Sequence, residues 1–173
     1  ELLTEAGYPE GFKTKFLVPT SGSGNMWPIP MNEYVQKNLK EVGIEVEIET
    51  MEWNSLITQF LQGFPSGSDF SAINFSLSPI SPAMFTKYFS TTTIAPNGAN
   101  SGAYSNPEVD ALLTEINQTF DKAKQDQLLQ QVSKIIADDA PWIFVTHDLN
   151  LRALSPNVHG FIQPQSWFVD LKS

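Results

Sequence analysis

The sequence contains no cysteine, and this absence excludes disulfides, thiolate catalysis and zinc sites with cysteine ligands. Basic residues are few, at 10 against 19 acidic ones, and the resulting net charge of −9 disfavours a binding face for nucleic acid or for anionic membranes. The sequence also lacks a run of about 18 apolar residues that could cross a membrane as a helix. What remains is a globular chain, and 173 residues are enough for one domain with a sizeable core.

Motifs for catalysis and for metal binding are missing as well. The two histidines, His147 and His159, are spaced in a way that matches no zinc pattern. The sequence has neither a nucleophile elbow nor a phosphate-binding glycine motif. Asp138 and Asp139 are adjacent and point in different directions, whereas glycosidase carboxylates face each other across about 5–10 Å. We therefore expect no catalytic residue, no metal site and no cofactor.

The first half of the chain alternates between strand and helix patterns. Strands are predicted over residues 12–18, 44–50 and 70–75, where apolar residues alternate or cluster. Helices are predicted over residues 31–42 and 53–61, and a glycine follows soon after each. This strand-helix-strand-helix-strand order predicts an α/β fold in which helices flank a sheet.

The chain starts with an incomplete helical pattern. Residues 1–7 have the composition of the last turns of a helix that ends at Gly7, and no capping residue precedes them. We interpret this pattern as a helix whose upstream sequence has been removed. A missing signal peptide is then uninformative.

The second half is rich in loops and ends in helices. Proline, serine and threonine cluster over residues 76–105, where only a short helix near 84–89 is predicted. Asn106 is a good helix cap before Pro107, and Asp121 caps a further helix that reaches about residue 137. Residues 142–146 and 149–154 are predicted strands, followed by a tail with little regular structure.

Aromatic residues are the richest functional signal. Trp27, Trp53, Trp142, Trp167 and Tyr104 fall in predicted loops or near the ends of predicted elements. Each alone is more typical of a core residue than of a site residue. Together, beside neutral polar loops, they are typical of a ligand cleft.

Five segments, in order along the chain, resemble one family of binding proteins. The segments are LLTEAGYPEGF (residues 2–12), LKEVGIEV with MEW (39–53), YSNPEVDALL (104–113), DAPWI (139–143) and VHGF (158–161). Their sequence and order resemble the extracellular solute-binding proteins of ABC importers, in the oligopeptide, dipeptide and nickel type called family 5.

The resemblance implies a fold and a biological role. It implies a truncated lobe of the type II periplasmic-binding-protein fold, an α/β lobe with a mixed sheet and flanking helices. Residues 1–140 would form the C-terminal lobe of a two-lobed clamp, and residues 141–173 would be crossover strands and a tail that return towards the N-terminal lobe. Such a protein binds a small solute between its lobes and delivers it to the membrane permease. The expected location is the periplasm or the cell exterior, and a lipid anchor on the full-length protein is left open.

The resemblance also indicates where the solute binds. Trp53 matches the tryptophan that lines the cleft in peptide-binding members. On this basis the expected ligand-binding residues are Trp53, Asn74, Phe75, Leu77, Ser78, Asn100 and Tyr104.

The sequence departs from the peptide-binding pattern at the expected cleft. Leu77 stands where those members have a second tryptophan, and the aspartate that holds the peptide ammonium group has no counterpart. Lys87 is the only charged side chain between residues 70 and 107. We therefore expect a neutral-polar solute, such as an oligosaccharide or a modified peptide. Two other readings stay open, a carbohydrate-active hydrolase and a self-associating sensory or interaction domain.

Overall fold

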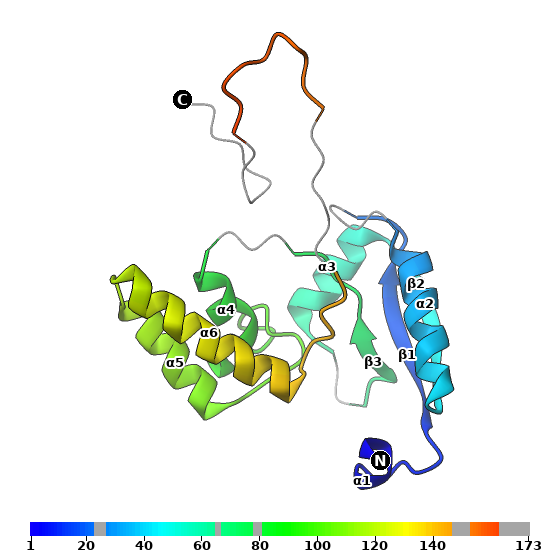
Figure 1. Ribbon diagram of the computed structural model, residues 1–173. Coiled ribbons are helices and arrows are strands. Elements are labelled where there is room, and N and C mark those ends of the chain that lie inside the picture. The colour runs from blue at the N-terminus through cyan, green and yellow to red at the C-terminus, as the bar shows by residue number, and fades with distance from the viewer. Residues whose placement is uncertain (23–26, 65–66, 78–80, 147–152, 163–173) are drawn as a thin grey trace.

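The computed structural model describes residues 1–22, 27–64, 67–77, 81–146 and 153–162. Its strands are β1 (Phe12–Pro19), β2 (Ile44–Met51) and β3 (Phe70–Ile73). Its helices are α1 (Leu2–Glu5), α2 (Pro28–Glu41), α3 (Trp53–Gln62), α4 (Ala83–Phe89), α5 (Pro107–Gln118) and α6 (Lys122–Asp139), with a 3-10 turn η1 (Thr91–Thr93) after α4. The predicted alternation of strands and helices is confirmed (Figure 1).

The three strands form one parallel sheet in the order β2-β1-β3. The β1–β2 register is regular from Phe12 opposite Ile44 to Pro19 opposite Met51. The β1–β3 register shifts by one residue between Lys15 and Phe16. The α/β class is confirmed, whereas the antiparallel member that a mixed sheet requires is not among the described strands.

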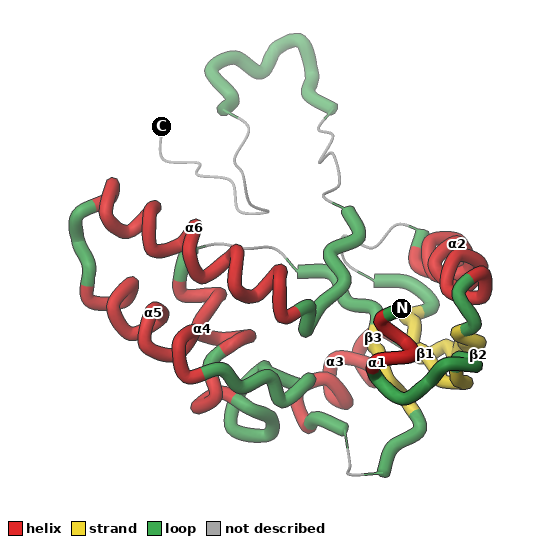
Figure 2. The backbone as a smooth tube through the Cα atoms, turned by 60° about the horizontal axis from the view of Figure 1, so that its bottom comes forward, coloured by secondary structure: helices red, strands yellow, loops and turns green. Residues whose placement is uncertain are grey.

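Helices α2 and α3 cover opposite faces of the sheet (Figure 2). Ile29, Val35 and Leu39 of α2 pack on one face against a small core that includes Val18 and Val46. Leu17 points to the other face, since neighbouring strand residues alternate, and it is 1% exposed. Because β1 lies between its two partners, the crossovers from β1 to β2 and from β2 to β3 run in opposite directions, and right-handed crossovers then place their helices on opposite faces.

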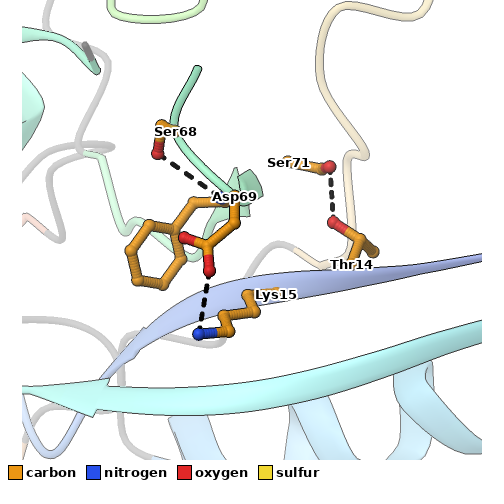
Figure 3. Close-up of polar contacts among 6 residues, drawn as sticks. Thr14, Lys15, Ser68, Asp69 and Ser71 are labelled. Carbon is orange, nitrogen blue, oxygen red and sulfur yellow. Dashed lines mark hydrogen bonds and ion pairs between the residues drawn. The ribbon is translucent and has the colours of Figure 1, made fainter. Parts of the chain in front are cut away.

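Side chains beside β1 add polar contacts to its pairing with β3 (Figure 3). The Thr14 hydroxyl donates to Ser71 Oγ, and Lys15 forms an ion pair with Asp69 at 2.9 Å. The Asp69 side chain is 65% exposed, so this ion pair contributes little to stability. The buried Thr14 hydroxyl matters more, because an unsatisfied polar group inside a protein is costly.

Helices α4, α5 and α6 form a second layer beside α3. Their buried side chains, which include Val109, Leu113, Val132 and Ile136, join Phe60 of α3 in the larger of the two cores. The predicted cap at Asn106 is confirmed, since its side chain accepts the backbone N–H of Glu108 and Val109. The cap at Asp121 is confirmed in the same way by the N–H of Lys124. No helix in the described residues is long and apolar enough to cross a membrane.

Some predicted boundaries are wrong. Helix α2 begins at Pro28, three residues before the predicted start, because Pro28 supplies the first-turn geometry that proline favours. Strand β3 ends at Ile73, although the N–H of Asn74 still donates to the Leu17 carbonyl at 2.8 Å.

The predicted strand over residues 142–146 is also wrong. These residues have no strand partner among the described residues, and Ile143, Phe144 and Val145 are 65%, 62% and 47% exposed. A strand exists only where a neighbour takes up its backbone hydrogen bonds. Most of the second predicted strand, over 149–154, lies outside the described residues, and its described end is not a strand.

The start of the β1–β2 pairing predicts a sharp difference between two glycines. A Cβ atom at Gly11 would lie 1.9 Å from the Gly43 carbonyl oxygen, which accepts the N–H of Phe12, whereas a Cβ at Gly7 meets nothing within 4 Å. Both have positive φ, so either alanine costs about 1–2 kcal/mol in backbone strain. We expect Gly11→Ala to lose about 1–3 kcal/mol more of the free energy of unfolding than Gly7→Ala. Urea unfolding of both variants measures the difference, and equal losses would contradict it.

Candidate functional site

The carboxyl edge of the sheet gathers the loops that follow all three strands. Parallel strands end at the same edge, and α2 and α3 both begin there (upper part of Figure 1). The chain leaves β1 towards one face of the sheet and leaves β2 towards the other. In open α/β sheets, ligands bind outside the carboxyl ends of the strands at such a reversal. We therefore define the candidate site as this carboxyl edge.

Trp53 is the first residue of α3, and a cap fixes it at the edge. The Glu52 carboxylate accepts the backbone N–H groups of Asn54 and Ser55 at 2.9 and 3.1 Å. Hydrogen bonds from these two N–H groups hold the pKa of Glu52 below its usual value. The negative charge of Glu52 is thus already engaged by the helix that carries the indole.

The Trp53 ring lies directly beside the chain that leaves β1. A Cβ atom at Gly22 would stand 2.6 Å from Cε3 of the indole, so only glycine allows the loop to pass this close. Loop and ring therefore touch at the end of the central strand.

Phe75 reaches the same place from the end of β3. Its ring stacks on Phe60 with centroids 4.3 Å apart, and it lies 5.1 Å from the Trp53 ring at 31°. Asn74 and Leu77 flank it, with Leu77 packed against the larger core. The structure thus brings two of the seven expected site residues, Trp53 and Phe75, into contact, with Asn74 next to Phe75 in the chain. Ser78 lies outside the described residues.

Asn100 organises a loop of the helical layer. Its side-chain amide donates to the carbonyls of Ser90 and Tyr104, and its oxygen accepts the N–H of Tyr104. The residue is 2% exposed. All of its polar groups have protein partners, and its expected contact with a solute stays a prediction.

Tyr104 connects that loop to the end of α6. Its hydroxyl donates to Asp139 at 2.5 Å, and the Asn106 amide donates to the same carboxylate oxygen at 2.8 Å. Burial, together with the neighbouring Asp139 carboxylate, raises the pKa of Tyr104 to about 12. The hydroxyl therefore stays protonated and keeps donating at neutral pH.

A row of seven rings in contact, which we call the aromatic row, joins the carboxyl edge to the Tyr104 loop. In order of contact it consists of Trp53, Phe75, Phe60, Tyr88, Trp142, Phe89 and Tyr104. Three of these rings, Trp53, Phe75 and Tyr104, were expected to contact solute, and four rings separate Phe75 from Tyr104. The sequence-based list therefore combines residues from two different places.

Two hollows lie along the sheet within the described residues. The structure has a hollow of about 320 Å³ between α3 and the sheet, lined by Leu17, Met51, Gln59 and Phe70 among others. A second hollow of about 360 Å³ lies over charged side chains of β1 and β2. Neither hollow has Trp53 or Phe75 in its lining.

Sequence reasoning counted Trp27 among the aromatic residues typical of a ligand cleft but left it out of the expected ligand-binding residues. It is the N-cap residue of α2, so it lies at the same edge, and it is 72% exposed. The sequence pattern predicted that this helix begins at Met31, which left Trp27 in a loop. The Pro28-Ile29-Pro30 sequence is the signal that could have placed the predicted start of this helix at Pro28, because proline suits the first helical position.

Residues 1–129 match the model of the middle region of the bacterial extracellular solute-binding proteins, family 5. The chain belongs to this family. Heme-binding protein A of Haemophilus influenzae is 29% identical to it over 94% of the chain, which corresponds to 29% of that relative. The glutathione-binding protein GsiB of Pectobacterium atrosepticum is 28% identical over 97% of the chain and 33% of its own length. The chain thus spans about 30% of these relatives.

Solved structures of the family share this fold. HbpA2 of Haemophilus parasuis superimposes with a TM-score of 0.70 at 26% identity, over 81% of this chain and 27% of that one. The dipeptide-binding protein of a Pseudoalteromonas species, solved with Met-Leu, gives a TM-score of 0.68 at 28% identity, over 81% of this chain and 27% of that one. The periplasmic-binding-protein-like lobe that the sequence indicated is therefore confirmed.

The Tyr104–Asp139 contact predicts a pH-dependent effect. Hydrogen bonds from Tyr104 and Asn106 hold the pKa of Asp139 below its usual value, so their stabilisation is complete above about pH 4 and is lost as the pH falls through the lowered pKa. We expect Tyr104→Phe to lower the melting temperature at pH 6, and this deficit to shrink as the pH falls towards 3. Tyr34→Phe, at a 71% exposed ring, is the control. A deficit independent of pH would contradict this account.

Proposed function

We propose that this chain forms one lobe of the solute-binding component of an ABC importer and holds solute at the carboxyl edge of its sheet. The observation that carries the proposal is the Trp53 ring, fixed at the start of α3 and in contact with Phe75. Membership of an extracellular solute-binding family supports it. Residues 1–140 would form the lobe, and residues 141–173 would return towards a second lobe. The protein would act in the periplasm or outside the cell and pass its solute to the permease.

The proposed solute is polar and uncharged at the end that meets this lobe. Between residues 70 and 107 the only charged side chain is Lys87, whose ammonium group lies 5.3 Å from the Tyr88 ring. A solute ammonium buried here without a counter-charge would cost several kcal/mol. Relatives named for heme, glutathione and oligopeptides show how widely solutes vary among similar proteins. An oligosaccharide or a peptide with a blocked amino terminus fits the edge best.

The competing hydrolase reading needs two free carboxylates that face a substrate. Asp138 forms an ion pair with Lys134, and Asp139 accepts hydrogen bonds from Tyr104 and Asn106. Both carboxylates at the end of α6 are thus engaged within the protein. This arrangement favours a binding role over hydrolysis.

Calorimetry on the full-length protein tests the solute class. Each tri- to pentapeptide is titrated in two forms, with a free and with an acetylated amino terminus, and maltotriose and cellotriose are titrated beside them. We expect acetylation to change Kd less than about threefold, since residues 70–107 carry no carboxylate and the Glu52 carboxylate already accepts two N–H groups of α3. A loss of about a hundredfold or more on acetylation would contradict the proposal of an uncharged solute.

Substitution of the fixed indole tests the site itself. We expect Trp53→Ala to weaken solute binding about tenfold or more, because the ring supplies stacking and burial that correspond to about 1.4 kcal/mol or more. Phe120→Ala is the matched control, because Phe120 is 97% exposed and follows α5, away from the sheet. Unchanged affinity in Trp53→Ala would remove the carboxyl edge as the binding site.

A further inference from the structure

We infer that Trp27 is a second indole of the solute-binding surface and that the solute presents a flat ring face to it. This inference rests on the proposed function, because it adds a contact and a ligand chemistry to the same carboxyl edge. It concerns a residue that the sequence patterns left in a loop.

The topology places one indole on each side of the sheet. Trp27 caps α2, and Trp53 begins α3. The two helices cover opposite faces and start at the same edge (Figures 1 and 2). The end of β1, the central strand, lies between these two helix starts, and its continuation at Gly22 touches the Trp53 ring. The two indole-bearing residues therefore lie on opposite sides of the end of β1.

The backbone of Trp27 is held firmly while its side chain is exposed. Its carbonyl accepts the N–H of Met31 at 3.1 Å, and the following Pro28 is buried. Asn32, itself 5% exposed, donates its side-chain amide to the Pro28 carbonyl at 2.7 Å. An indole left 72% exposed forgoes most of the burial that stabilises tryptophan in a core. The backbone that carries this ring is thus fixed at the edge, and the ring is open to contact by a solute.

The surroundings of Trp27 select an uncharged partner. No ionisable residue occurs from Phe16 to Asn32, and the only charged side chain of residues 70–107 is Lys87 on α4. Aromatic rings bind the faces of other rings by stacking and by burial of apolar surface. A sugar ring and an aromatic side chain share this chemistry, so the assigned ligand is a neutral solute with a flat ring face.

Tyr34 supplies a matched comparison on the same helix. Its ring is 71% exposed, nearly as much as that of Trp27. It lies seven residues further along α2, about 10 Å from the edge at the rise of a helix. A general effect of removing an exposed aromatic ring from α2 would therefore appear at both positions, whereas solute contact appears only at Trp27.

The test is calorimetry on the full-length protein and its Trp27→Ala, Trp27→Phe, Tyr34→Ala and Trp53→Ala variants. The probes are cellotriose, maltotriose, and N-acetylated tripeptides that contain either two phenylalanines or only alanine. We expect the probe that binds the wild type best to be a ring-bearing ligand. For that probe, we expect Trp27→Ala to raise Kd about tenfold or more and Trp27→Phe to change Kd less than about threefold. Tyr34→Ala is expected to leave Kd within about twofold, and the sugar and phenylalanine arms show which ring is bound.

The outcomes separate this inference from the proposed function. If Trp53→Ala weakens binding and Trp27→Ala does not, the second indole is overturned and the proposed function stands. Equal losses in Trp27→Ala and Tyr34→Ala, or preference for the alanine peptide, would also overturn the inference. If the wild type binds none of the probes, the proposed function fails and the inference fails with it.

Discussion

The parallel pairing of β1 with both β2 and β3 is the constraint on which the rest of the structure depends. It is held at its start by the close approach of Gly11 to Gly43 and at the other side by the Thr14–Ser71 hydrogen bond. With β1 in the middle, the crossover helices must cover opposite faces, and the chain must leave the sheet in two directions at one edge. The open carboxyl edge follows from this order of strands.

The aromatic row connects that edge to the helical layer. Each ring contact adds about 0.5–1.5 kcal/mol beyond the area it buries, so the six contacts form a substantial part of the larger core. The Phe75 ring stacks on Phe60 of this core and also contacts the Trp53 ring. The site is therefore rigid because its first rings belong to the packing of the lobe, and rigidity reduces the entropy cost of binding.

The sequence predicted the order of the elements because their apolar patterns are local. Helix caps at Asn106 and Asp121 were predictable for the same reason, since a cap depends on residues within one turn. The strand predicted over 142–146 is wrong because a strand depends on a distant partner, and the apolar pattern there reports only that Trp142 packs on Tyr88 and Phe89. Sequence-based prediction has a comparable limit at Asn100 and Tyr104, since no sequence pattern reveals that their side chains form hydrogen bonds within the protein.

The family resemblance predicted Trp53 as a ligand-binding residue, but it did not predict which residues surround the Trp53 ring. That Gly22 touches its ring and that the Phe75 ring lies beside it at 5.1 Å are consequences of strand order, which no local pattern encodes. The absence of carboxylates over residues 70–107, in contrast, could be predicted from the sequence alone.

A structure of the full-length protein with its bound solute tests the central claim most directly. We predict that the solute lies within about 4 Å of the Trp53 ring at the carboxyl edge of the sheet, the range of apolar contact. No charged side chain from residues 70–107 would then contact it. A solute bound away from Trp53, or held by an ion pair with Lys87, would contradict the account.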